Sequence, residues 1–522
     1  MKNFFAAGGA VPWWISGLSL FMSFFSAGTF VVWGSIAYTH GWVSVTIQWT
    51  MAIAGFIIGF FIAPRWHRAR VLTAAEYITQ RLGLKVQKLY SHLFLIISLF
   101  TTGAFLYPVA KIVEVSTGFP LHWCIIVLGL IIILYTTAGG LWAVIVTDVL
   151  QFIILTAAVL VVVPLAFKKV DGISGFLQNT PDEFFNLFSG EYTLGFMIAF
   201  GLYNLFFISG NWAYVQRYTS VPTHKEAKKV GYLFGSLYLI SPVIWMLPPM
   251  IFRVFNPGLE GFGDEGAYLM MCKEVLPIGM LGLMLGAMIF ATSSSVNTTL
   301  NIAAGVFTND LYKNINPNTS NKQLMVVARM ATVAFGILTI VVALLVQNMG
   351  GIVEVVLSVA AITGAALYLP PIWSLFSKRQ NGKSILTATL VSLAINAVFK
   401  FVTPNVFNFS LNRAEEMILG VFVPITILIA FEMWFILKKK NNPDFETYEK
   451  LRAAKELAEQ DVDVSDVQNR HGRKVIALGI LGTGILIAVI GLFAENGKWL
   501  VTLAGFMILL IGILIKPKKN KK

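Results

Sequence analysis

Residues 291–301 place hydroxyl and amide side chains inside an otherwise apolar stretch of the chain. Six of the seven side chains from Thr292 to Thr298 are polar, and only Val296 interrupts them. Hydrocarbon offers such groups no water to bond, so they need partners in the protein or a bound guest. Hydroxyl and carbonyl oxygens are the ligands that hard cations prefer. The run therefore predicts an ion held within a membrane.

The spacing within this run favours sodium. Ser294 and Thr298 are four residues apart and share one face of a helix. The carbonyl of Ala291 and the hydroxyl of Ser295 border the same space, and Asn297 flanks it. Sodium suits oxygen ligands that are mostly neutral. Alternatively, each hydroxyl bonds the carbonyl one turn back in its own helix. That reading accounts for one or two of the hydroxyls but poorly for all of them.

Asp148 lies deep in a second apolar stretch, between Val144 and Phe152. A carboxylate within a membrane span is costly and is functional by default. Thr147 and Gln151 offer polar support. The alternative is a structural ion pair, but this span supplies no cation. We therefore expect Asp148 to couple transport to a cation or a proton.

The composition is that of a protein that crosses a membrane many times. The 522-residue chain is 57% hydrophobic and 12% charged, whereas soluble domains carry about 25% charged residues. About fourteen apolar runs approach the length of a bilayer-spanning helix, roughly 20 residues. They lie near 12–37, 44–64, 88–116, 122–140, 142–167, 192–215, 230–254, 276–308, 325–348, 352–376, 383–402, 416–437, 475–493 and 497–515.

The basic residues indicate topology rather than a nucleic-acid partner. If Met1 lies in the cytoplasm and the spans alternate, 31 of the 39 Lys and Arg residues fall on the cytoplasmic side. This positive-inside pattern accounts for the net charge of +13. It predicts cytoplasmic N- and C-termini in a bacterial inner membrane. The basic tail at 516–522 can also touch anionic lipid.

Two spans contain clusters of small and polar residues, at Ser16–Thr29 and at Gly201–Asn211. They lie five spans apart, so each begins a block of five helices. Because five is an odd number, the second block crosses the membrane in the opposite orientation to the first. Interrupted helices at matching positions of two inverted halves are typical of a secondary transporter's binding site. Alternatively, Gly and Ser merely permit close helix packing. The matched pair and the polar run together favour the binding site.

Two isolated amides are further candidates. Gln48 stands beside Trp49 in the second span, where it could bond a substrate or another helix. Asn204 lies at the sixth-span interruption, before Phe206 and Phe207, which could cap a substrate or simply pack. The sequence has no P-loop motif and no credible nucleophile–base grouping. We therefore do not expect an enzyme.

Short motifs recur in a characteristic order between residue 4 and about residue 380. They occupy residues 4–8, 12–14, 17–19, 37–39, 73–77, 135–140, 147–151, 216–217, 294–295, 300–301 and 310–312. In order and spacing they resemble the sodium:solute symporter family. That family includes bacterial sodium-coupled carriers for galactose, sialic acid, proline and pantothenate. The resemblance implies an all-α polytopic membrane protein with the LeuT-type inverted five-plus-five repeat and additional C-terminal helices.

The resemblance also implies a sodium site. Its ligands would be the backbone carbonyls of Met22, Phe25 and Ala291 and the hydroxyls of Ser294 and Ser295. Family members usually carry a small side chain at the position of Met22. Because the expected ligand is the backbone carbonyl, a larger side chain is tolerated there.

Some family members have a second sodium site. Here it would use Asp148, Ser294, Asn297 and Thr298, with Asn297 in place of the usual hydroxyl.

The implied substrate site combines features of sugar and sialic acid carriers. Ser26 and Thr29 match positions that hold the sialic acid carboxylate, Gln48 matches a substrate-reading position in both types, and Asn204 matches the sugar type. The expected set is Ser26, Thr29, Gln48, Asn204, Phe207 and Tyr238.

The chain departs from the carriers at several of these positions. Phe207 and Ile208 replace a gating Tyr-Trp pair. Tyr238 stands at a sugar-contacting Lys position and Leu357 at a sugar-contacting Gln. Thr101 aligns near the Arg that assists sialic acid carriers.

We expect a transporter core at 1–380 with inverted repeats at about 11–167 and 192–376. Family members carry one helix before the first motif, so the resemblance implies either a misassigned start or a truncated copy, with the ten-helix core complete. The parts after the core would be peripheral helices at 381–437, a cytoplasmic linker at 438–474 with a charged surface helix at 443–459, a helical hairpin at 475–515 and the basic tail at 516–522.

The sequence therefore predicts a sodium-coupled symporter that imports a small polar organic solute, a sugar or sugar acid, by alternating access. Its partners would be the solute, sodium ions and the lipid bilayer, with no obligate protein partner evident. Proton coupling, an amino-acid or vitamin substrate, and a non-transporting membrane sensor are the alternatives.

Overall fold

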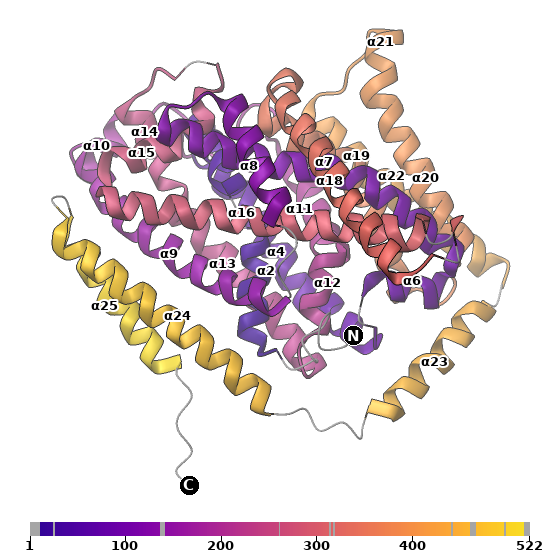
Figure 1. Cartoon of the computed structure of the whole chain (residues 1–522). Helices are drawn as coiled ribbons and strands as arrows, with labels where there is room; N and C mark the ends of the chain where they lie inside the picture. The colour runs from indigo at the N-terminus through magenta and orange to yellow at the C-terminus, as the bar shows by residue number, and fades with distance from the viewer. Residues whose placement is uncertain are drawn as a thin grey trace.

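A computed structural model describes the chain outside residues 1–10, 25–26, 72, 136–140, 260, 313–314, 317–318, 440–441, 460–465, 495–496 and 516–522. Only the backbone is described for residues 135, 141–147, 261, 291, 293–294, 297–298, 301–302, 309–311, 321–322, 457–459, 466–473 and 475. The described secondary structure is helical apart from one isolated bridge in a loop (Figure 1).

The helices follow the expected spans closely. Ten described helices are long and apolar enough to cross a membrane, and two bent helix pairs add one span each. Shorter apolar helices at Leu121–Leu134 and Ile278–Phe290 fall in the two remaining expected spans. The prediction of an all-α polytopic membrane protein is therefore confirmed.

The first five spans run from α2 to α9. Their elements are α2 (Trp13–Phe24), η2 (Thr29–Trp33) and α3 (Gly34–His40), then α4 (Val43–Ile57), η3 (Ile58–Ile62) and α5 (Ala63–Arg68), then α7 (Leu84–Thr117), α8 (Leu121–Tyr135) and α9 (Leu141–Lys168). The short helices α6 (Ala74–Leu82) and α10 (Gly172–Asn179) lie outside the spans.

The next five spans run from α11 to α19. Their elements are α11 (Leu194–Gly210) and α12 (Trp212–Thr219), α13 (His224–Trp245) and α14 (Leu247–Phe255), α16 (Ile278–Val306), α18 (Asn321–Leu345) and α19 (Gly351–Phe376). Between them lie η4 (Gly261–Gly266), α15 (Ala267–Val275), η5 (Phe307–Tyr312) and η6 (Gln347–Met349).

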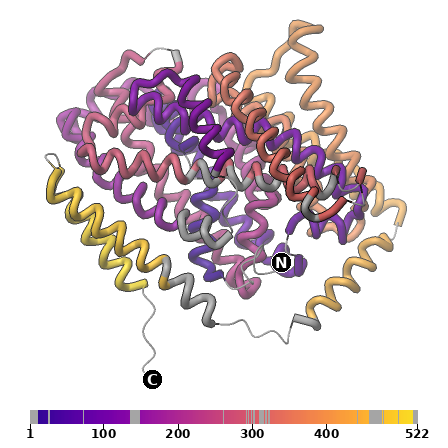
Figure 2. The backbone as a smooth tube through the Cα atoms, viewed as in Figure 1, coloured from indigo at the N-terminus to yellow at the C-terminus, as the bar shows by residue number. Residues whose placement is uncertain are grey.

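The remaining helices lie around this core. They are α20 (Gly382–Ala397), η7 (Val398–Val402), α21 (Thr403–Phe407), α22 (Arg413–Leu437), α23 (Pro443–Glu459), α24 (Asp466–Phe493) and α25 (Lys498–Ile515). The α24–α25 hairpin packs against α9 on one side of the molecule, and α23 lies near α6 on the other (Figure 2).

Both predicted interruptions appear as bent helix pairs. The chain turns by 58° between α2 and η2, and by 63° between α11 and α12. At the second bend Asn211 adopts an extended backbone conformation, and its side chain accepts the N–H of Ala213 to begin α12. Gly210 ends α11 where an added Cβ would lie 2.9 Å from Tyr368, so this end of the helix presses directly on α19.

Small residues let α13 cross α4 and η3 at very short range. A Cβ added to Gly231 would lie 2.5 Å from the Cα of Gly59, and one added to Gly55 would lie 2.8 Å from the Cα of Gly235. Gly-x-x-x-Gly spacing on both helices permits this backbone approach. Close packing thus explains these glycines, which lie outside the two interruptions.

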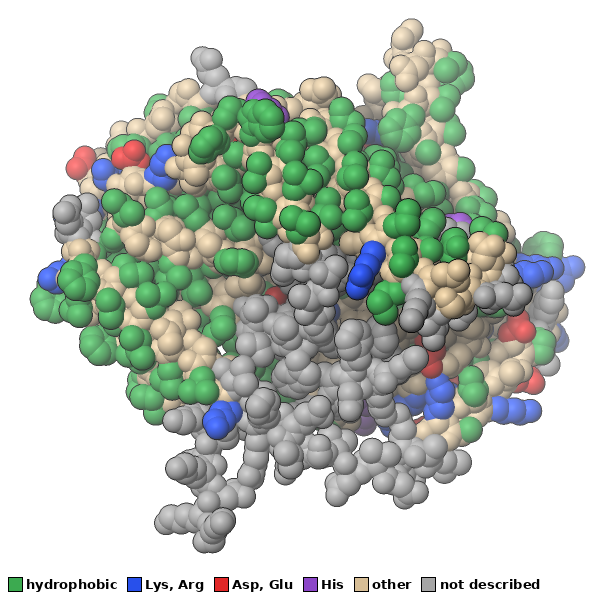
Figure 3. All heavy atoms as spheres, in the orientation of Figure 1, with side chains coloured by type: hydrophobic (Ala, Val, Ile, Leu, Met, Phe, Trp, Pro, Cys, Tyr) green, Lys and Arg blue, Asp and Glu red, His purple; other side chains and the backbone are tan. Residues whose placement is uncertain are grey.

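The outer surface is apolar over much of its area, as a surface facing lipid should be. Figure 3 shows hydrophobic side chains crowded over the upper part of the molecule, where α8 and α18 lie in Figure 1. Leu134 and Met330 are among the exposed members of this surface. Membrane-facing helices bury their polar backbone within the helix and leave apolar side chains outside.

The charged helix expected at 443–459 is present as α23, and it is docked on α6. Tyr448 packs edge-on against Tyr77 with 5.7 Å between ring centroids, and Lys455 pairs with Glu76 at 2.7 Å. Burial raises the pKa of Tyr448 to about 12, so the phenol stays neutral at physiological pH. The contact between the Tyr448 and Tyr77 rings therefore involves an uncharged Tyr448 in that range.

Candidate functional site

A central cavity of about 140 Å³ lies where the two bent helices face each other, bordered by α4, α7 and α19. Aromatic rings dominate its wall. They belong to Phe24, Trp33, Phe105, Phe200, Tyr203, Phe207, Tyr214 and Tyr368. A small number of polar groups interrupts them: Ser23, Thr29, Thr101, Asn204 and Thr363. A mostly apolar cleft with a few polar groups is the usual form of a small-molecule site.

Three of the expected substrate residues meet in this cavity: Thr29, Asn204 and Phe207. The hydroxyl of Thr29 donates to the carbonyl of Phe24 at 3.0 Å across the first bend. Asn204 is 1% exposed, and its Nδ2 has no hydrogen-bond partner among the described residues. A buried donor without a partner is unfavourable. The Asn204 amide is therefore the cavity group best placed to bind a ligand oxygen.

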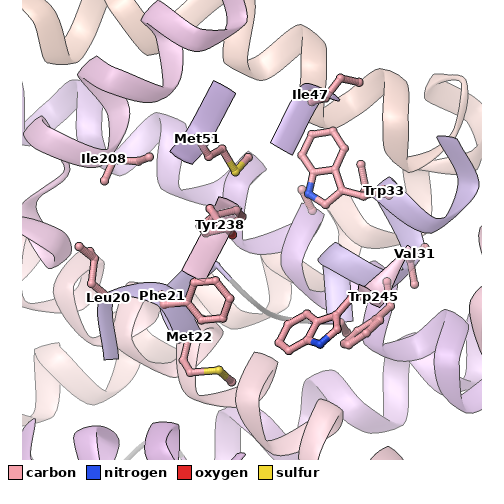
Figure 4. Close-up of a cluster of buried hydrophobic side chains, with 14 of the residues drawn as sticks. Leu20, Phe21, Met22, Val31, Trp33, Ile47, Met51, Ile208, Tyr238 and Trp245 are labelled. Carbon is pink, nitrogen blue, oxygen red and sulfur yellow. The ribbon is translucent and has the colours of Figure 1, made fainter. Parts of the chain in front are cut away.

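Gln48 and Tyr238 do not line the central cavity. The Gln48 amide donates at 3.2 Å to the carbonyl of Ser44, one turn back in its own helix. Tyr238 packs against Phe21, with ring centroids 4.9 Å apart, within the buried cluster drawn in Figure 4. Ser26 lies outside the described residues.

The positions where the chain departs from the carriers fall in different places. Thr101 lines the central cavity, whereas Ile208 and Leu357 are buried elsewhere. On α19 the cavity wall is formed instead by Val356 and Thr363, together with Val359, Ala360 and Tyr368.

A second cavity, of about 90 Å³, adjoins the first, because Ser23, Thr101, Phe207 and other residues line both. It extends to Asp148 and Arg217. Helices α2, α7, α9, α12 and α16 contribute to its wall. The wall contains both an acidic and a basic side chain, in contrast to that of the central cavity.

Asp148 is 5% exposed and accepts a hydrogen bond from the Ser19 hydroxyl at 2.7 Å. The sequence supplied no cation within its own span, but Arg217 of α12 lines the same cavity and interacts electrostatically with the carboxylate. Arg217 also donates to the Ala213 carbonyl at 2.8 Å, and its Nε is buried without a partner. The positive charge near Asp148 thus comes from a helix far away in sequence.

The polar run on α16 lies directly beside the first bend. The Thr292 hydroxyl accepts the backbone N–H of Ala27 at 2.9 Å and donates to the Met288 carbonyl at 3.0 Å. Thr299 donates to the carbonyl of Ser295 at 3.0 Å. Back-bonding therefore occurs at Thr292 and Thr299. Thr292 additionally joins α16 to the segment after α2.

Among the expected sodium ligands, the side chains of Met22 and Ser295 are described. Met22 is buried in the last turn of α2, where helix carbonyls lack intrahelical partners. Ser295 is half-buried and lines the second cavity. Phe25 lies outside the described residues, and only the backbone is described for the others, Ala291, Ser294, Asn297 and Thr298. Neutral oxygens at a helix end, with a carboxylate in the adjoining cavity, are a donor set that fits sodium.

Comparison with known proteins connects this geometry to a family. A sequence model described as the sodium:solute symporter family matches residues 4–392. The chain belongs to this family. The symporter is therefore a transporter, and sodium is its coupling ion.

The symporter has relatives in bacteria and in vertebrates. It is 26% identical over 408 residues to the sodium/sialic acid symporter NanT of Aliivibrio fischeri, covering 75% of this chain and 81% of that protein. It is 27% identical over 450 residues to the sodium/glucose cotransporter 4 of Danio rerio, covering 77% and 68%.

A solved structure confirms the predicted fold. A Na⁺-coupled sialic acid symporter in a substrate-bound outward-open state matches with a TM-score of 0.66 and 21% identity, over 83% of this chain and 92% of the other. The symporter therefore has the LeuT-type fold that its motifs implied.

Sequence reasoning did not identify every residue at the cavities. The sequence alone did not place Arg217 in the cavity of Asp148 or bond Ser19 to Asp148, because Arg217 lies on α12 and Ser19 on α2, while Asp148 lies on α9. It also did not place Trp33 and Tyr203 in the central cavity. An aromatic side chain in an apolar span gives no sequence signal that separates a cavity wall from a packed core.

Proposed function

We propose that this symporter imports a small, uncharged, polyhydroxylated solute such as a sugar, driven by sodium through alternating access. The observation that carries this proposal is the Asn204 amide, which is buried at the cavity wall with its Nδ2 unpartnered. Rings such as Trp33 and Tyr203 offer flat apolar faces to the C–H side of a sugar ring, while Asn204 and Thr29 offer hydrogen bonds to hydroxyls. The names of the relatives support a sugar-type solute: a sodium/glucose cotransporter fits the uncharged class, whereas a sodium/sialic acid symporter fits a sugar acid.

A sugar acid is the second candidate. No Lys, Arg, Asp or Glu is among the described residues that line the central cavity, which favours an uncharged solute. A buried carboxylate needs a partner of opposite charge. The adjoining cavity supplies Arg217, and Thr101 borders both spaces. A sugar acid would therefore have to extend its carboxylate toward Arg217.

We also propose that the coupling sodium binds between the end of α2 and α16. Its ligands would be the carbonyls of Met22, Phe25 and Ala291 and the hydroxyls of Ser294 and Ser295. The hydrogen bond from Ala27 to Thr292 supports this assignment, because it joins the same two segments. Sodium bound there would hold α16 against the first bend and so shape the neighbouring substrate cavity. Its release would loosen both.

Asp148 would act at a second sodium site with Ser294, Asn297 and Thr298. Arg217 bears on this proposal, because a fixed positive charge in the same cavity competes with a second cation for the carboxylate. Proton coupling through Asp148 is the alternative. Sodium bound at the second site should therefore weaken the attraction between Asp148 and Arg217, whereas protonation of Asp148 would remove it.

The symporter would lie in a bacterial inner membrane with both termini in the cytoplasm. The basic residues support this orientation, because Arg65, Arg68 and Lys228 gather at the same end of the helices as the docked α23. Positive charge of this kind marks the cytoplasmic side.

A thermal-shift screen tests the substrate proposal. Purified protein in sodium buffer is heated with neutral sugars, sugar acids, amino acids and vitamins, and the screen is repeated with Asn204→Leu. A neutral sugar should raise the Tm of the wild type and have little effect on the variant. Stabilisation by amino acids or vitamins alone would overturn the proposal. Stabilisation by sugar acids alone, lost in Arg217→Gln, would establish the second candidate.

A further inference from the structure

A third cavity, of about 540 Å³, lies away from the transport site, under the docked helix α23. Its walls come from the ends of three spanning segments, η3–α5, α13 and α19, and from α6 and α23. It shares no lining residue with the central cavity or with the cavity of Asp148. Neither sodium nor the transported solute accounts for it.

The cavity has a large excess of positive charge. Five basic side chains line it, Arg65, Arg68, Lys228, Lys378 and Arg452, against one carboxylate, Glu449.

The single carboxylate is already engaged, because Glu449 pairs with Arg452 at 3.1 Å. The Nε of Arg452 is buried and has no hydrogen-bond partner among the described residues. Arg65 uses one guanidinium nitrogen to donate to the Phe61 carbonyl of its own helix, at 2.7 Å. Like charges held around one space repel each other, and an anion bound among them would offset that repulsion.

The same cavity has an apolar edge. Phe60, Phe61 and Phe376 line it, and they are 56%, 48% and 45% exposed on the ends of spanning helices. Cations lie over these rings, with Arg65 4.2 Å from the centroid of Phe376 and Lys228 5.3 Å from that of Phe60. A ligand that fits would carry an anionic head and an apolar body. Aromatic and basic residues at the end of a span mark the depth of lipid headgroups.

We propose that this cavity binds the phosphate headgroup of an anionic phospholipid from the cytoplasmic leaflet. The phosphate would lie among Arg65, Arg68 and Lys228, and the acyl chains would run over the exposed phenylalanines. Basic pockets between spanning helices on the cytoplasmic side suit such headgroups. The proposal rests on the cytoplasmic orientation given above but not on the identity of the transported solute.

A bound headgroup would also link the linker helix to the core. Arg452 belongs to α23, whereas Arg65 and Arg68 belong to α5 and Lys228 to α13. One phosphate contacted from both sides would strengthen the docking that Tyr448 and Tyr77 already provide. Lipid composition would thereby stabilise the attachment of residues 443–459 to the transporter.

The test uses the purified full chain in detergent, with phosphatidylglycerol, phosphatidylcholine or inorganic phosphate as the probe. Phosphatidylglycerol should raise the Tm and remain bound in native mass spectrometry, with a response that weakens as salt is added. Phosphatidylcholine should have little effect. Equal stabilisation by the two lipids would overturn the proposal. Stabilisation by inorganic phosphate alone would reassign the cavity to a soluble phosphate compound and overturn it as well.

A matched pair of double variants locates the site. Arg68→Gln with Lys228→Gln removes two charges from the cavity. Lys85→Gln with Lys225→Gln removes two charges from exposed positions on nearby helices that do not line it. The cavity pair should weaken phosphatidylglycerol binding about thirtyfold, at roughly fivefold per lost charge, and the exposed pair should change it far less. An equal loss in both pairs would show a general surface effect and refute the assignment.

Discussion

Thr292 offers the sharpest test of how α16 and the first bend cooperate in sodium binding. Its hydroxyl is fully buried and accepts the Ala27 N–H at 2.9 Å. In Thr292→Val the side-chain shape is retained, but the N–H loses its acceptor. Leaving a buried donor unsatisfied costs about 1–3 kcal/mol. If this bond forms only when the two segments are arranged for sodium, that loss corresponds to roughly 5- to 150-fold weaker sodium binding.

The assay is the sodium dependence of the Tm of purified protein. It reports affinity separately from any overall loss of stability, because the variant's own sodium-free Tm is the baseline. Thr292→Ser keeps the hydroxyl and should retain near wild-type affinity. Thr308→Val is the matched control, since the buried Thr308 hydroxyl bonds the Ala304 carbonyl one turn back and no other described residue. A folded Thr292→Val protein that binds sodium as tightly as the wild type would refute the reasoning.

Three further predictions concern the cavities and the helix packing. Asn204→Leu should raise the KM for the transported solute at least about tenfold, because the solute loses one good hydrogen bond. Gln48→Leu should have a smaller effect on KM, because that amide is bonded within its own helix. Asp148→Asn and Arg217→Gln should each lower the Tm, while the double variant should be more stable than the sum of the two losses predicts; strict additivity in a double-mutant cycle would contradict a shared interaction. Gly231→Ala should destabilise the protein by about 1–3 kcal/mol, since the added Cβ would lie 2.5 Å from the Cα of Gly59. An unchanged Tm would show that α13 and η3 can separate freely.

Hydropathy predicted the spans well because each span reports its own burial in lipid. All of the expected spans correspond to helices, and both interruptions appear as bends. The polar run from Thr292 was expected to need partners close by, because hydroxyls within a membrane find no water to bond. The described members of the run bond both within α16 and across to Ala27. The spans and the bends are local properties, so the sequence alone could predict them, whereas the bond to Ala27 joins residues 265 positions apart.

The arrangement of side chains between helices could not be predicted in the same way. Gln48 and Met51 lie three residues apart on α4, yet of the two only Met51 lines the central cavity. The rotation of α4 is set by its close crossing with α13, and sequence periodicity was too weak to reveal it. Arg217 lines the same cavity as Asp148 because the chain bends at Asn211 and redirects α12.

Transport of a neutral sugar into proteoliposomes is the direct test of whether this protein couples sugar import to sodium. Purified symporter is reconstituted, and uptake of a radiolabelled sugar selected by the thermal-shift screen is followed with an inward gradient of sodium, potassium or choline. If sodium drives symport, the sugar should accumulate above its equilibrium level with the sodium gradient only. The accumulated sugar should be lost when the gradient is collapsed. Equal uptake with all three cations would contradict sodium-coupled symport.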